Sequence, residues 1–259
     1  MSFWGFLVLG LPLTYGQFQI TITVTSAILT FVSAASSSEE QPVLTPVQLM
    51  WVNLFQDTLA ALALATDPPT HSVLDRKPDS KSASLITTAM WKMIVGQTIY
   101  QMAATLILYF RGIQILSYQT AHEKEQLQTL VFNVYVWMQI FNMYKYVYLQ
   151  RPGTDFVLIS GSHRQLENKL NIFEGIFHNR LFITISLIMI GGQVLIAFVG
   201  GRAFSVTPLD HAQWAYSIVI GVVSIPIGVI IRVIPDKLFE KMIPGVRRVT
   251  SRLTVWRRG

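Results

Sequence analysis

Long apolar runs separated by short polar segments organise the whole chain. Five of these runs are long enough to cross a hydrocarbon core, which takes about 20 residues of α-helix. They lie near 46–66, 90–110, 127–149, 181–201 and 212–234. A sixth apolar stretch is interrupted by Pro12, Gly16 and a threonine-rich run, so we expect only its second half, 18–35, to form a span. The pattern predicts an all-α membrane protein, a bundle of about six transmembrane helices whose first member is irregular.

The polar connections between these runs alternate in charge. Lys and Arg gather in the segments 67–89 and 150–180 and in the tail that follows the last span, and they are sparse in the other connections. Cytosolic loops of membrane proteins are enriched in Lys and Arg. The three basic segments therefore belong on the cytosolic side, and six spans then place both ends of the chain there.

The composition changes the picture only by excluding some functions. Of the 259 residues, 51% are hydrophobic and 13% are charged, whereas about a quarter are charged in soluble domains. The net charge of +6 lies between the apolar runs and in the tail, which indicates membrane topology and not nucleic-acid binding. Cysteine is absent and the five histidines fall in loops without ligand spacing, so we predict no metal site built on these residues.

Two polar side chains stand inside the run 46–66, in the string VQLMWVNLFQDTLAALALATDPP. Asn53 and Asp57 are four residues apart, so an α-helix projects them from one face, with Gln56 beside them. A carboxylate at mid-membrane costs about 3 kcal/mol and is tolerated mainly where it faces the protein interior or an ion path. Spacing alone leaves two interpretations open: the oxygens bind a hard cation such as calcium, or Asp57 is protonated or hydrogen-bonded and joins neighbouring helices.

The same string resembles the sixth transmembrane helix of the calcium-transporting P-type ATPases, and SVLDRKP resembles the loop that follows it. Later strings resemble that family's eighth span, the next cytosolic loop and the last luminal turn: QTLVFNVYVWMQIFN, NKLNIFEGIF and FVGGRAFSVTPLDHAQW. The resemblance covers 18–235 and is strongest to the plasma-membrane group and its fungal vacuolar relatives. It implies a multi-pass protein of the plasma or vacuolar membrane with calcium as the transported ion, and manganese as the alternative because it accepts the same oxygens.

The resemblance also implies which residues hold the ion. Asn53 and Asp57 match the family's ion-coordinating Asn and Asp. Thr23 stands where the plasma-membrane group keeps an Asn, and Gln139 stands where the reticulum type keeps a Glu. For Gln139 we favour an interhelical hydrogen bond over coordination, so Thr23, Gln56 and Gln139 are weaker candidates.

Three motifs that this family uses to couple ATP to transport do not occur in the chain: DKTGT, TGE and PEGL. ATP and magnesium are therefore expected to be bound only by full-length members, and the chain alone is predicted neither to hydrolyse ATP nor to pump. We expect a fragment of a calcium pump, such as a clipped gene model. The alternative is a non-transporting relic or regulator that associates with an intact pump or another membrane partner. An unrelated channel or carrier is disfavoured by the sixth-span string.

We divide the chain into an atypical N-terminal segment, 1–17, a membrane domain, 18–235, and a basic cytosolic tail, 236–259. The tail interleaves Arg with Leu, Val and Trp, a pattern that suits anionic lipid or calmodulin. Positive-inside charge alone also explains it.

Two further patterns concern packing. Trp51, Trp91 and Trp214 lie near span ends and are expected in the membrane interface. The pairs 191–192 and 200–201 are both Gly-Gly, which permits close helix approach or a bend.

Overall fold

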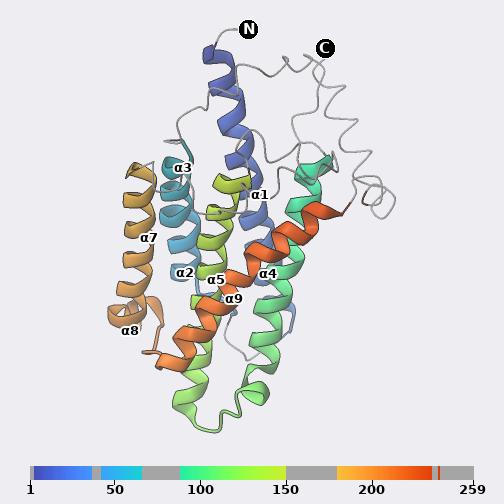
Figure 1. The fold of residues 1–259 in the computed structure, drawn as a ribbon. Helices are drawn as coiled ribbons and strands as arrows, with labels where there is room; N and C mark the ends of the chain where they lie inside the picture. The colour runs from blue at the N-terminus through green and yellow to red at the C-terminus, as the bar shows by residue number, and fades with distance from the viewer. Residues whose placement is uncertain (1–2, 37–41, 66–87, 150–179, 235–238, 240–259) are drawn as a thin grey trace.

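The computed structural model describes residues 3–36, 42–65, 88–149, 180–234 and 239, and every regular element within them is helical. The elements are α1 Phe3–Ser36, α2 Pro46–Met50, the π-helix η1 Trp51–Gln56, α3 Asp57–Ala65, α4 Thr88–Ile115, α5 Ala121–Leu149, α7 Arg180–Val199, α8 Gly201–Phe204 and α9 His211–Val233. Helices occupy each of the six predicted spans, and the chain is an all-α membrane protein (Figure 1).

Four helical segments of the described residues are long and apolar enough to cross a membrane. They are Gly16–Ser36, Met90–Ile115, Arg180–Val199 and His211–Val233. The stretch 46–65 is also helical throughout, with the π-helix between α2 and α3. α5 carries many amide and tyrosine side chains, but all its residues from Leu130 to Ile140 are buried inside the bundle. Its polar groups therefore meet protein instead of lipid, as buried polar groups in membrane helices generally do.

The predicted interruption near Pro12 and Gly16 is wrong, because α1 runs through both as one helix of 34 residues. Proline is tolerated in membrane helices where the freed backbone groups find other partners. At 1.5 Å per residue the helix is about 50 Å long, which exceeds a hydrocarbon core of about 30 Å. Its N-terminal part projects beyond the other helices in Figure 1. The boundary expected at residue 17 thus falls within a continuous helix.

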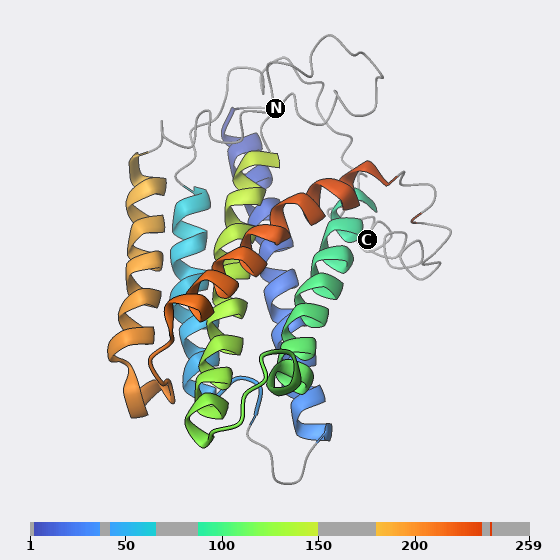
Figure 2. The same cartoon turned by 60° about the horizontal axis from the view of Figure 1, so that its bottom comes forward.

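α9 crosses the bundle obliquely and packs on α5 and α4 (Figures 1 and 2). Gly221 makes the close contact with α5 possible, because a Cβ atom there would lie 2.9 Å from Cβ of Trp137 and 3.1 Å from its carbonyl carbon. Small residues at such crossings let membrane helices approach closely. The crossing therefore depends on the missing side chain.

Three side chains of α4 donate hydrogen bonds to main-chain carbonyls along α9, which contains Pro226. Lys92 Nζ lies 2.7 Å from the carbonyl oxygen of Ile234, Gln97 Nε2 lies 3.2 Å from that of Ser224, and Tyr100 Oη lies 2.6 Å from that of Ile220. Lys92 is only 5% exposed, and its ammonium group lies at the C-terminal end of α9. Cations stabilise this end of a helix because the last carbonyls carry partial negative charge.

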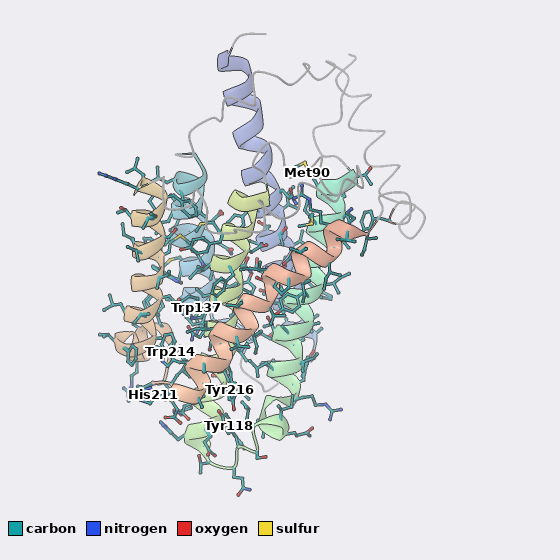
Figure 3. All side chains as sticks on the ribbon, in the orientation of Figure 1. Met90, Tyr118, Trp137, His211, Trp214 and Tyr216 are labelled. Atoms are coloured by element: carbon teal, nitrogen blue, oxygen red, sulfur yellow. The ribbon has the colours of Figure 1, made fainter. Side chains whose placement is uncertain are left out.

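The end of the bundle opposite Met90 carries Tyr118, His211 and Tyr216 (Figure 3). Here Gln213 Nε2 lies 2.5 Å from Tyr118 Oη and 3.3 Å from Gln126 Oε1. Gln126 in turn donates to the carbonyl oxygen of Pro208 at 2.9 Å. These bonds attach the turn between α8 and α9 to the beginning of α5.

Several predictions fall outside the described residues. They concern most of the two basic connections, 67–89 and 150–180, and the basic tail apart from residue 239. The membrane orientation and the binding of lipid or calmodulin by the tail therefore stay predictions.

Candidate ion site around a π-helical turn

The candidate residues Asn53 and Asp57 lie in and directly after an irregular turn. η1, Trp51–Gln56, is a π-helix that joins α2 to α3 without a break. The main-chain N–H of Asp57 donates to the carbonyl oxygen of Val52, five residues earlier, as well as to that of Leu54. Such π turns inside α-helices are rare and often lie at functional sites.

The two candidate side chains differ in their exposure. Asp57 is 5% exposed and lies inside the bundle, whereas Asn53 is exposed. The common face expected from their spacing of four residues is therefore not seen, because Asp57 lies inside the bundle and Asn53 does not. Their role as ion ligands stays a prediction.

Gln56, the last residue of η1, is a second buried oxygen donor and directly precedes Asp57 in the chain. Its side chain is 2% exposed, and its Nε2 lies 3.4 Å from the carbonyl oxygen of Val136 on α5. Its Oε1 is buried and has no hydrogen-bond partner within the described residues. A buried amide oxygen without a partner is uncommon in folded proteins, and calcium is bound by oxygens of this type.

Gln139 makes the interhelical hydrogen bond that we favoured for it. Its Nε2 lies 3.1 Å from Oε1 of Gln101 on α4, and both side chains are fully buried. Thr25 Oγ1 on α1 donates to the same Gln101 oxygen at 3.2 Å. The Gln101–Gln139 pair therefore joins α1, α4 and α5, and its amide groups already have protein partners.

Thr23 does not point into the bundle. It lies on α1 and is exposed, while its carbonyl oxygen accepts a hydrogen bond from Ser26 Oγ at 3.1 Å. Within the described part of the chain no group of three or more His, Asp or Glu side chains could hold a metal ion. A cation bound at Asp57 would therefore depend largely on neutral oxygens and on groups from outside these residues.

Sequence reasoning missed Gln193, which contacts this turn, and Asn133, which contacts Gln193. Trp51 Nε1 donates to Gln193 Oε1 at 3.2 Å, and Gln193 Nε2 donates to Asn133 Oδ1 at 2.9 Å. Trp51 is thus bound within the bundle, although its position near a span end predicted a place in the interface. The available signal was Gln193 itself, the one amide side chain in the apolar run 180–199. The adjacent Gly192 allows the close approach that the Gly-Gly pair predicted.

Comparison with known proteins identifies the family to which this chain belongs. The family model described as cation transporting ATPase, C-terminus, matches residues 41–234. The chain belongs to this family. The matched residues include η1, Asp57 and all the described helices from α2 to α9. The family is a multi-pass membrane family, and the resemblance predicted from the sixth-span string is confirmed.

Relatives of this family member are calcium-transporting ATPases. Calcium-transporting ATPase 2 of Schizosaccharomyces pombe is 48% identical over 241 residues, which are 93% of this chain and 17% of that protein. Calcium-transporting ATPase 2 of Saccharomyces cerevisiae is 40% identical over 235 residues, 88% of this chain and 20% of the relative. Calcium-transporting ATPase 10, plasma membrane-type, of Arabidopsis thaliana is 39% identical over 233 residues, 90% of this chain and 20% of the relative. The chain spans about a fifth of the length of the curated relatives that it matches.

Proposed function

We propose that this chain is the C-terminal membrane part of a calcium-transporting P-type ATPase and that Asn53 and Asp57 coordinate the transported ion. The observation that carries the proposal is the burial of Asp57, which is 5% exposed and directly follows a π-helical turn. A buried carboxylate in a membrane helix is costly and usually marks an ion path. Its place in the family's C-terminal region, together with relatives named for calcium transport, supports calcium over manganese.

The ligands in this chain are only part of a calcium site. Calcium takes about 6 to 8 oxygens, and the nearby donors are the carboxylate of Asp57, the amides of Asn53 and Gln56 and, less directly, the hydroxyl of Thr23. Because the relatives are about five times longer, we infer that another helix of a complete pump covers the face that carries Asn53. That helix would supply the missing oxygens, and other parts of the pump would bind ATP and magnesium.

The placement of the chain in the cell is part of the same proposal. We place it in the plasma or vacuolar membrane with both ends in the cytosol. The distribution of Lys and Arg among the connections supports this orientation. The basic tail, 236–259, would then face the inner leaflet, where it can meet anionic lipid or calmodulin.

A chimaeric pump tests the proposal. The last part of the Schizosaccharomyces pombe calcium-transporting ATPase 2 would be replaced by this chain, and ATP-driven uptake of radioactive calcium into membrane vesicles would be measured. We expect uptake by the chimaera and its loss in Asp57→Asn, because the neutral amide removes the charge that binds calcium. Glu125→Gln, a similar change at an exposed position, serves as the matched control. Normal uptake by Asp57→Asn would show that Asp57 is not a ligand of the transported ion.

The isolated chain separates this proposal from the alternative of a relic or regulator. Purified in liposomes with ATP, it should show no calcium uptake. Measurable uptake would contradict the proposal that the chain is only part of a pump. A chimaera that reaches the membrane but does not transport, while the chain co-purifies with an intact pump, would favour the regulator.

A further inference from the structure

The π-helical turn is held from outside by α7 through its first residue. The indole Nε1 of Trp51 donates to Gln193 Oε1 at 3.2 Å, and Gln193 donates onward to Asn133 Oδ1 on α5 at 2.9 Å. Gln193 and Asn133 are both fully buried. A hydrogen bond between buried amides is strengthened by a low local dielectric constant, so the orientation of the Trp51 ring is fixed by two neighbouring helices.

The same ring fills a space that only glycine leaves open. A Cβ atom on Gly192 would lie 2.8 Å from Cη2 and 3.1 Å from Cζ2 of Trp51, closer than carbon atoms normally approach. A Cβ atom on the preceding Gly191 would meet nothing within 4 Å. Trp51 also stacks on Phe55 across the turn, with ring centroids 5.6 Å apart. The indole is therefore confined by packing on both sides.

The last residue of the turn is attached as well. Gln56 donates to the carbonyl oxygen of Val136 on α5, so the two ends of η1 are tied to α7 and α5. A π turn is less favourable than a regular α-helical turn and persists where its surroundings hold it. Within η1, the exposed Asn53 lies between these two attachments along the chain.

We propose that Gly192 and Gln193 are positioning residues that hold the π turn through Trp51 and thereby set the direction of Asn53 relative to Asp57. Neither residue touches the ion. Their effect on calcium affinity rests on the proposed function, but their effect on the geometry of the turn does not. The two effects can therefore be tested separately.

The geometry is tested on the full chain, which contains no cysteine. Spin labels on Asn53→Cys and Ile107→Cys, both at exposed positions, report the distance from the turn to α4 in lipid nanodiscs. Gly192→Ala and Gln193→Leu should shift or broaden this distance distribution. Gly191→Ala is the matched control and should leave it unchanged, and Gln193→Glu should retain it because an acceptor for the indole remains. An identical distribution in Gly192→Ala and Gly191→Ala would overturn the proposal.

The effect of these residues on calcium affinity is tested in the chimaeric pump, where the half-saturating calcium concentration and the maximal rate of uptake are measured separately. Gly192→Ala and Gln193→Leu should raise the half-saturating calcium concentration about fivefold, the equivalent of one ordinary hydrogen bond, with little change in maximal uptake. A lower maximal uptake at unchanged half-saturation would indicate only a structural role and overturn the assignment. Trp51→Phe, which keeps a ring but loses the N–H donor, should behave like Gln193→Leu.

The controls distinguish the two proposals. If Asp57→Asn has no effect on transport, the proposed function fails, and the spin-label distances alone decide whether Gly192 positions the turn. If Asp57→Asn abolishes transport while Gly192→Ala and Gly191→Ala share one calcium dependence, the positioning role fails and the proposed function stands.

Discussion

Replacing Gln101 by Leu should destabilise the helix bundle, and replacing its partner Gln139 as well should restore most of the loss. The two amides are fully buried and joined at 3.1 Å on one side and 3.5 Å on the other. The bond itself contributes about 0.6 kcal/mol if it follows the average for membrane helices. The larger effect in Gln101→Leu comes from leaving the Gln139 amide without a partner, which costs about 1 to 3 kcal/mol. Thr25 adds little, because its single hydroxyl proton has a nearer acceptor in the carbonyl oxygen of Thr21, 2.7 Å away, than in Gln101 Oε1, 3.2 Å away.

The assay is a double-mutant cycle. Reversible unfolding of the full chain in mixed micelles with increasing dodecyl sulfate, followed by circular dichroism, gives the free energy of unfolding of the four proteins. We expect each single change to cost about 2 kcal/mol and the double change under about 1 kcal/mol, since both unpaired amides are then gone. Gln114→Leu, at an exposed position of the same helix, is the control and should be nearly neutral. The reasoning would be refuted if the double variant lost as much unfolding free energy as the two single variants together.

Three further predictions follow from other contacts. Lys92→Met should lower the free energy of unfolding by about 2 kcal/mol, because the carbonyls at the end of α9 lose a charged donor. Lys92→Arg should lower it less in the same dodecyl sulfate titration. Gly221→Leu should separate α9 from Trp137 and cost about 1 to 3 kcal/mol, whereas Gly191→Leu, where space is open, should not. Hydrogen bonds from the backbone of Thr120 and then Gln119 hold the pKa of Glu123 below its ordinary value of 4.5. This stabilisation is present above that value and is lost as pH falls below it, so thermal unfolding of Glu123→Gln should depend less on acid than the parent.

The sequence predicted the fold well because membrane helices are apolar runs of defined length. The span predicted at 212–234 is α9, His211–Val233, within one residue at each end. α1 was the exception, since Pro12 suggested a break that the helix does not show. Proline weakens a helix locally without always ending it. The sequence pattern around Pro12 does not distinguish a helix that ends from one that continues.

The candidate site was only partly predictable. A lone carboxylate in an apolar run marked Asp57, and its burial agrees. The exposure of Asn53 was not predicted, because a spacing of four residues was expected to put it on the same face as Asp57. The π turn that contains Asn53 was not predicted either. Nothing in the string WVNLFQ announces that turn. It becomes explicable only when the contact from Trp51 to Gln193, 142 residues later, is known.

The way α4 binds α9 affects how these two helices can diverge. Lys92, Gln97 and Tyr100 all donate hydrogen bonds to main-chain carbonyl oxygens of α9 or of the residue that ends it. Any residue that keeps the helical backbone offers the same acceptors, so the outward positions of α9 are free to vary with the lipids of different organelles. The inner surface of α4 has less freedom, because each lost donor removes a hydrogen bond between the two helices. Between related members of this family, substitutions should therefore accumulate on the outer side of α9 faster than on the side of α4 that it covers.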